Sequence, residues 1–131
     1  MDEVFRMVCA PAALATAPTA WSVDTLRNGD IAWLADDGGL EAIFDAAHRL
    51  DLIAISIIRR EQTADAQEQT VISFAGSFPL VWIAGGFSEH ARQWSRDRGP
   101  MTLLVECDGP IPDDERARIG RFLALLERQT E

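Results

Sequence analysis

The sequence contains no lysine and no tyrosine, and it has two cysteines, Cys9 and Cys107. Without lysine the chain cannot carry the phosphate-binding loop that ends in Gly-Lys-Ser or Gly-Lys-Thr. Neither cysteine has a histidine or a second cysteine at the spacing of a zinc site. We therefore predict two buried, reduced thiols, no metal site and no cofactor.

Long apolar stretches are also missing. No run of about 18 apolar residues is present to span a membrane. The start, Met1-Asp2-Glu3, lacks the positive segment and apolar stretch of a secretory signal. The net charge of −9 disfavours binding to nucleic acid or to an anionic membrane. These features predict a cytoplasmic protein. Its acidity would suit a basic protein partner, although it also keeps a small protein soluble.

Residues that would indicate catalysis are few. His48 and His90 fall on the polar faces of predicted helices, where we expect them to be solvated. A nucleophile–base pair of Cys107 and His90 would need a contact that the sequence does not indicate. The carboxylates of Asp36–Asp37 and Asp113–Glu115 cluster at predicted helix starts, where the helix dipole accounts for them. We predict no catalytic residue.

The chain is 131 residues long and 47% apolar, which predicts one domain with a single core. Two segments resemble each other. Ile31-Ala32-Trp33-Leu34-Ala35 leads into Asp36-Asp37-Gly38-Gly39, and Leu80-Val81-Trp82-Ile83-Ala84 leads into Gly85-Gly86. A helix-like pattern and then an apolar run follow each segment, so we predict two strand–helix–strand units.

In the first unit, the strand covers 30–35 and a second strand covers 52–58. Between them we expect a helix whose apolar face carries Leu40, Ile43, Phe44, Ala47 and Leu50. In the second unit, we expect a strand over 80–84, a helix capped by Ser88 and ended by Gly99-Pro100, and a strand over 101–106.

The other segments are assigned as follows. We predict a short strand over residues 4–10 and a loop or loosely ordered arm over residues 10–20. Residues 21–26 fit either a hairpin strand closed by Asn28-Gly29 or a short helix. We predict a polar loop or hairpin tip over residues 59–69 and another strand over residues 71–75. A final helix begins at Pro112 or Asp113, with an apolar face of Ile119, Phe122, Leu123 and Leu126.

From residue 30 this order predicts a ferredoxin-like βαββαβ sandwich with an extra C-terminal helix. The core would cover 30–107, with an N-terminal arm over 1–29 and the last helix within 108–131. Helices would cover one sheet face. The arm, the last helix or a second subunit would cover the other, so we predict a homodimer.

The two glycine turns are the candidate ligand site. They join carboxyl ends of strands to amino ends of helices, where small ligands bind in α/β proteins. The same residues would also serve as ordinary turns and helix caps. The predicted ligand-binding residues are Asp36, Asp37, Gly38, Gly39, Gly85, Gly86 and Ser88.

The first turn resembles ACT domains, which carry an Asp-x-x-Gly-Leu/Val step between their first strand and helix. Asp36, Gly39 and Leu40 match this step, and 52–57 looks like the second strand. The proline that precedes the ACT glycine is Gly38 here. The resemblance implies a regulatory module that binds an amino acid at this turn. Two alternatives are an acidic protein-interaction factor (immunity protein, antitoxin or secretion chaperone) and a small dimeric α+β barrel enzyme with an apolar cavity.

Overall fold

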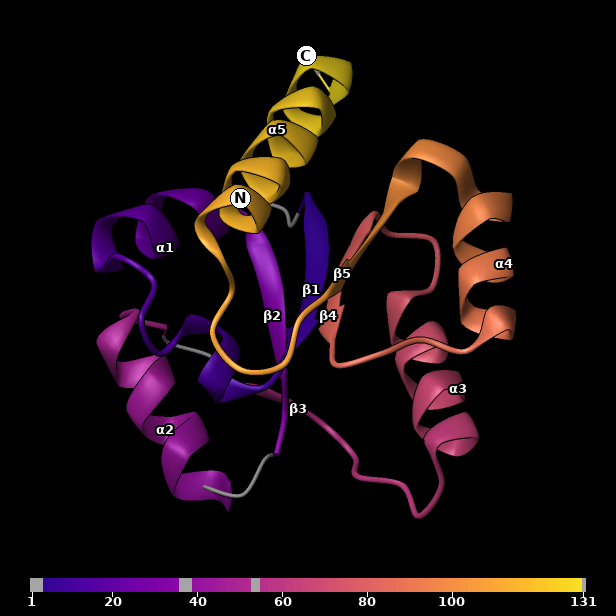
Figure 1. The fold of residues 1–131 in the computed structure, drawn as a ribbon. Helices are drawn as coiled ribbons and strands as arrows, with labels where there is room; N and C mark the ends of the chain where they lie inside the picture. The colour runs from indigo at the N-terminus through magenta and orange to yellow at the C-terminus, as the bar shows by residue number, and fades with distance from the viewer. Residues whose placement is uncertain (1–3, 36–38, 53–54, 131) are drawn as a thin grey trace.

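The computed structural model describes residues 4–35, 39–52 and 55–130 (Figure 1). Within them, one sheet contains five parallel strands in the order β3-β2-β1-β4-β5. The strands are β1 (Phe5–Cys9), β2 (Gly29–Leu34), β3 (Ser56–Ile58), β4 (Leu80–Ala84) and β5 (Thr102–Glu106). The helices are α1 (Thr19–Leu26), α2 (Gly39–Arg49), α3 (Ala64–Ala75), α4 (Glu89–Arg98) and α5 (Asp113–Thr130), with 3-10 turns η1 (Pro11–Leu14) and η2 (Gly99–Met101). The α/β class is confirmed, but the ferredoxin-like arrangement is wrong.

The central strand is β1, which lies inside the segment that we predicted to be an N-terminal arm. Cys9 is in register with Trp33 of β2 on one side, and Val8 is in register with Trp82 of β4 on the other. The strand predicted at residues 4–10 is confirmed. The two similar segments are therefore the two neighbours of β1, and the chain winds outward from β1 in both directions, as in doubly wound folds.

The decisive difference from the predicted fold is α3. We predicted a loop and a strand where the chain forms a helix from Ala64 to Ala75. The hydroxyl of Thr63 caps this helix by accepting the N–H of Ala66 at 3.1 Å. Val71 and Ala75, one helical turn apart, are both buried. A helix at this place forms a crossover between β3 and β4, which allows the two strands to be parallel.

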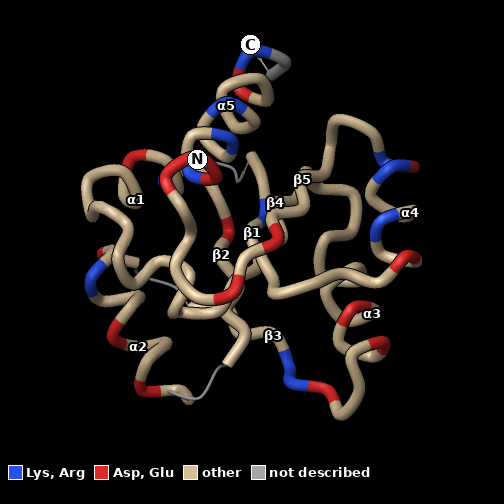
Figure 2. Tube along the Cα trace, viewed as in Figure 1, with Lys and Arg blue, Asp and Glu red and all other residues tan. Residues whose placement is uncertain are grey.

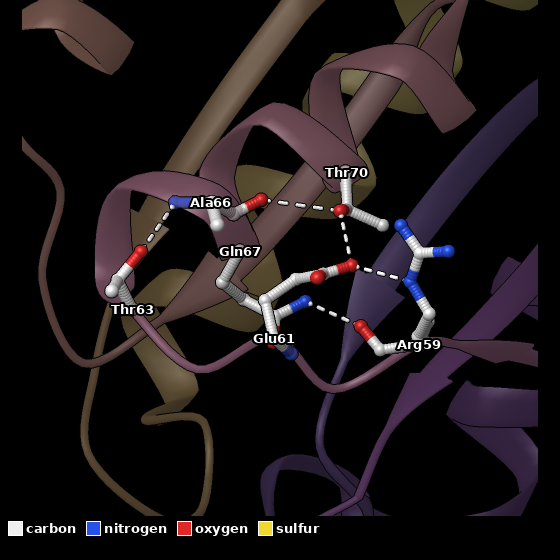
Figure 3. A network of polar contacts seen from close by, with 6 residues as sticks. All are labelled: Arg59, Glu61, Thr63, Ala66, Gln67 and Thr70. Atoms are coloured by element: carbon white, nitrogen blue, oxygen red, sulfur yellow. Dashed lines mark hydrogen bonds and ion pairs between the residues drawn. The ribbon is translucent and has the colours of Figure 1, made fainter.

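A polar network holds the segment that enters α3 (Figure 3). The carboxylate of Glu61 accepts hydrogen bonds from Arg59 Nε at 2.6 Å and from the Thr70 hydroxyl at 2.7 Å. These two hydrogen bonds lower the pKa of Glu61 below its ordinary value. The Gln67 amide donates to the Arg59 carbonyl and accepts the Glu61 N–H, both at 3.0 Å. The start of the segment that we predicted to be a polar loop or hairpin tip is thus tied to the helix.

Helices cover both faces of the sheet. In Figure 1, α1, α2 and α5 lie on one side, and α3 and α4 lie on the other. Trp33 is fully buried in the core between the sheet and the layer of α1, α2 and α5. Trp82 packs in the core on the other face, edge-to-face against Trp94 with ring centres 6.3 Å apart. Because the chain covers both faces itself, the reason that we gave for a second subunit does not hold. The homodimer stays a prediction.

The helices of the two predicted units are confirmed in type, but α2 is rotated. Ile43 and Ala47 are buried as expected, whereas Leu40 and Phe44 are 54% and 51% exposed. Ala46 takes the buried place expected of Phe44. The buried face of α2 is therefore narrower than the apolar face that we predicted, and Leu40 and Phe44 are left exposed to solvent.

Candidate functional site

All the strands end at one edge of the sheet, because they are parallel. Open α/β sheets bind ligands outside this carboxyl edge, at the point where the strand order reverses. Here the order reverses beside β1, which has β2 on one side and β4 on the other. Ala10 follows β1 and Gly85 follows β4. These positions mark where a ligand site is expected in such a fold.

A 3-10 turn, η1, occupies the position directly after β1. It begins with Pro11, which has no N–H, and the Ala13 N–H donates to the Ala10 carbonyl at 3.0 Å. The segment after β5 folds over this turn, with the Ile111 N–H donating to the Ala13 carbonyl at 3.0 Å. Figure 1 shows this segment looping past the lower end of β1 before it turns up into α5. The point of reversal is therefore covered, apart from a small pocket of about 110 Å³ that Gly85 helps to line.

A larger cavity lies next to this covered point, between η1, α2 and the turn after β5. Its volume is about 740 Å³. We call it the carboxyl-edge hollow. Small side chains form most of its wall, and three charged side chains join them. The lining residues are Ala10, Pro11, Ala12, Ala15, Ala42, Asp45, Ala46, Arg49, Asp108 and Gly109.

Arg49 fixes one wall of the hollow. Its Nη2 donates to the Leu14 carbonyl at 2.9 Å and its Nη1 donates to the Ala15 carbonyl at 3.1 Å. These carbonyls lie at the end of η1, and the Leu14 carbonyl also accepts the N–H of Ala17 at 3.4 Å. Arg49 therefore joins α2 to η1, and both of its terminal nitrogens are engaged by the backbone.

The two carboxylates of the hollow are not neutralised. Neither Asp45 nor Asp108 has a hydrogen bond or ion pair among the residues that the structure describes. Elsewhere in the described chain, six arginines pair with carboxylates. Figure 2 shows acidic positions on α2 and on the segment that follows β5. The hollow thus combines an apolar wall with an excess of negative charge.

The predicted ligand-binding residues that the structure describes share none of these cavities: Gly85 lines one, Ser88 another, and Gly39 and Gly86 neither. Asp36, Asp37 and Gly38 lie outside the described residues. Gly39 begins α2 with a φ of +65°, which favours glycine, and it does not line the hollow. Gly85 lines the small pocket at the point of reversal, and Gly86 lines neither this pocket nor the hollow.

Ser88 caps α4 as predicted, and its hydroxyl accepts the N–H of Ala91 at 3.1 Å. An anion does lie at this helix start, but the protein supplies it. The carboxylate of Glu68 accepts the Ser88 N–H at 2.8 Å and also accepts the Ser88 hydroxyl proton. We missed Glu68 because we predicted a loop where α3 lies.

The nucleophile and base that we considered are separated. Cys107 packs with the core under α5, whereas His90 is on α4 in the other helix layer and bonds Gln69 at 3.1 Å. Burial, together with the nearby Glu115 and Asp108, raises the pKa of Cys107. Burial, and then the nearby Cys107, raises the pKa of Cys9 to about 12. Both thiols are therefore protonated near neutral pH, which makes them poor nucleophiles.

The hollow itself was missed by sequence reasoning. One side of its wall is formed by Ala10, Pro11, Ala12 and Ala15, in the segment that we predicted to be a loop or loosely ordered arm. A usable signal was present, because small residues directly after a buried strand leave space at the carboxyl edge of a parallel sheet. These small residues predict a cavity only once residues 5–9 are known to form the central strand.

Comparisons with known proteins give no relative: no family model, no curated protein and no solved structure matches the chain. Among the described residues, no helix is long and apolar enough to cross a membrane. The same residues contain no group of three or more histidine, cysteine or acidic side chains that could hold a metal ion.

Proposed function

We propose that this protein is a non-catalytic small-molecule-binding module and that the carboxyl-edge hollow is its binding site. One observation carries the proposal: a cavity of about 740 Å³ beside the point where the strand order reverses. Ligand pockets commonly have volumes of about 300–1,000 Å³ and apolar walls with a few polar groups. The alanine wall with Asp45, Arg49 and Asp108 fits that description.

A regulatory role follows from the elements that the hollow joins. A ligand there would contact both α2 and the turn at Asp108–Gly109, which leads into α5. Binding would therefore restrain two parts of the chain that are distant in sequence. An amino acid is one ligand of suitable size, and it is the ligand implied by the resemblance to ACT domains.

A filled hollow tests the proposal. The substitution Ala42→Phe adds bulk at a partly exposed position of α2 that lines the cavity. The matched control is Ala64→Phe, at an exposed position that begins α3 in the other layer. Amino acids and small amines are screened by thermal shift against the full chain. We expect at least one compound to stabilise the native protein and Ala64→Phe but not Ala42→Phe.

Two results would reject the binding site. One is that no compound of the screen raises the melting temperature of the native protein. The other is that ligands stabilise Ala42→Phe as much as the native chain, which would place binding elsewhere.

Protein interaction is the second candidate, and exposed apolar side chains favour it. Leu40 and Phe44 are exposed on α2, and Ile57 is 46% exposed on β3, an edge strand. Exposed edge strands and apolar patches are common at protein interfaces. The partner would be a second copy or the basic protein favoured by the acidity. If a Phe44→Asp variant and the native chain both measure as monomers by light scattering, self-association is rejected.

The enzyme alternative has less support. A small α+β barrel enzyme would use an apolar cavity on an uncovered sheet face. Here α1, α2 and α5 cover one face, and α3 and α4 cover the other (Figure 1).

A further inference from the structure

We infer that the carboxyl-edge hollow selects a compact organic cation, a small amine with an apolar body, over anions of the same shape. This inference rests on the proposed function, because it assigns the class of ligand to the same site. It follows from three properties of the hollow: its unpaired carboxylates, the engaged N–H groups of Ala13 and Ala15 in η1, and its alanine wall.

The charge of the hollow is the first reason. Asp45 and Asp108 have no ion-pair or hydrogen-bond partner among the described residues, and both line the cavity. Arg49 is the cation of the lining, but the carbonyls of Leu14 and Ala15 engage both of its terminal nitrogens. A ligand ammonium would therefore meet two free carboxylates. A ligand carboxylate or phosphate would meet a single guanidinium, which already donates to two carbonyls, and both carboxylates would repel it.

The backbone at η1 is the second reason. In dinucleotide-binding folds, free N–H groups that follow the first strand face a phosphate. Here Pro11 has no N–H, and the N–H groups of Ala13 and Ala15 donate to the carbonyls of Ala10 and Ala12. These groups cannot hold an anion without breaking η1. The segment that would bind phosphate in such folds is therefore unsuited to it in this protein.

The wall of the hollow is the third reason. Five alanines and a proline surround the cavity, so the body of the ligand meets methyl and methylene groups. Asp45 and Asp108 are exposed to solvent beside this wall, so they would attract an ammonium as surface charges do, in a salt-dependent way. A molecule with an apolar body and one ammonium group satisfies both parts of the hollow. A free amino acid has the ammonium but adds a carboxylate, so it should bind more weakly than the amine.

Three probes of one shape test this inference: 2-phenylethylamine, phenylalanine and 3-phenylpropanoate. Their affinities for the full chain are measured by ligand-observed NMR at low salt. We expect the amine to bind at least tenfold more tightly than the anion, with phenylalanine between them. Added salt should weaken binding of the amine because it screens the carboxylates.

Isosteric variants identify the carboxylates. Asp45→Asn and Asp108→Asn should each weaken binding of the amine severalfold while the circular dichroism spectrum is unchanged. The control is Asp65→Asn, an exposed position in the first turn of α3, which should leave the affinity unchanged.

The outcomes separate the two claims. The cation preference is wrong if the anion binds as tightly as the amine, or if only compounds without an ammonium group bind. In either case the proposed site stands as long as Ala42→Phe removes the binding. If neither these probes nor any compound of the thermal-shift screen binds in a way that Ala42→Phe removes, both claims fail. Equal loss of affinity in all three Asp→Asn variants would also overturn the assignment to Asp45 and Asp108.

Discussion

The carboxylate of Glu68 on α3 accepts both the N–H and the hydroxyl of Ser88 at the start of α4. It thereby joins the two helices that cover one face of the sheet. It also places a negative charge at the positive end of α4. The glycine turn before Ser88, which we predicted to bind a ligand, thus receives a negatively charged group from Glu68 of the same chain.

We expect the substitution Glu68→Ala to lower the free energy of unfolding by about 1–3 kcal/mol, because it leaves part-buried donors without an acceptor. Glu68→Gln, which keeps an acceptor oxygen, should recover part of this loss. The control is Glu89→Ala, which removes an exposed pairing with Arg96 and should cost less than about 1 kcal/mol. Urea unfolding measures all three. Equal stability of Glu68→Ala and Glu89→Ala would contradict this role for Glu68.

The rotation of α2 gives a second prediction. Phe44→Ala should change stability by less than about 1 kcal/mol, because the ring is half exposed. Its neighbour Ile43 is fully buried, so Ile43→Ala should cost about 2–5 kcal/mol. Thermal unfolding of the two variants decides between the faces. A larger loss for Phe44→Ala would support the apolar face that we expected from the sequence.

The buried thiol of Cys9 predicts loss of stability in alkali. Its pKa is about 12 in the folded protein, against 9.0 for an ordinary thiol. Between these values the unfolded chain releases the proton and the folded chain keeps it. The free energy of unfolding therefore falls as the pH rises, by up to about 1.4 kcal/mol per pH unit.

The sequence has no lysine and no tyrosine to titrate in the same range, so Cys107, whose pKa is also raised, is the other side chain to consider. The comparison is unfolding of the native chain and of Cys9→Ala at a series of pH values from 8 to 11. The native chain should lose stability more steeply than the variant. Parallel curves would show that Cys9 is not held protonated.

The lowered pKa of Glu61 predicts a loss of stability at acidic pH. Its pKa lies below the ordinary value of 4.5, because Arg59 and Thr70 donate hydrogen bonds to the carboxylate. The stability that it contributes is present above that ordinary value and is lost as the pH falls through the lowered one. We expect Glu61→Gln to lose less stability on acidification than the native chain. Acid unfolding followed by circular dichroism measures this difference, and a steeper loss in the variant would be inconsistent with the network.

The segment 71–75 shows why the fold could be predicted only in part. Val-Ile-Ser-Phe-Ala is short and apolar, and such a run fits a buried strand or a buried helix equally well. The N-cap of α3, Thr63, lies within the polar stretch 59–69 that we predicted to be a loop or hairpin tip. Once this segment became a strand, the strands around it had to pair antiparallel. One local error therefore changed the topology, although a strand was predicted at the place of each of the five observed strands and a helix at the places of α2, α4 and α5.

The candidate site was less predictable than the fold. Ser88 was correctly identified as a cap, because capping depends on neighbouring residues. The hollow depends on Ala10 to Ala15, Arg49 and Asp108, which the sheet order brings together from three distant segments. Their residue types carry little information without that order. A contact between Glu68 and Ser88 likewise needs the packing of two helices to be known.

The most direct test of an amine-binding site in the hollow is a titration of the isotopically labelled chain with 2-phenylethylamine, followed by the backbone N–H signals in NMR spectra. The account predicts saturable shifts that centre on Ala12, Ala42, Arg49 and Gly109, around the hollow. The signals of Glu68 and Ser88, in the other helix layer, should not move. Saturable shifts centred on α3 and α4, or no saturable shift at millimolar amine, would contradict the account.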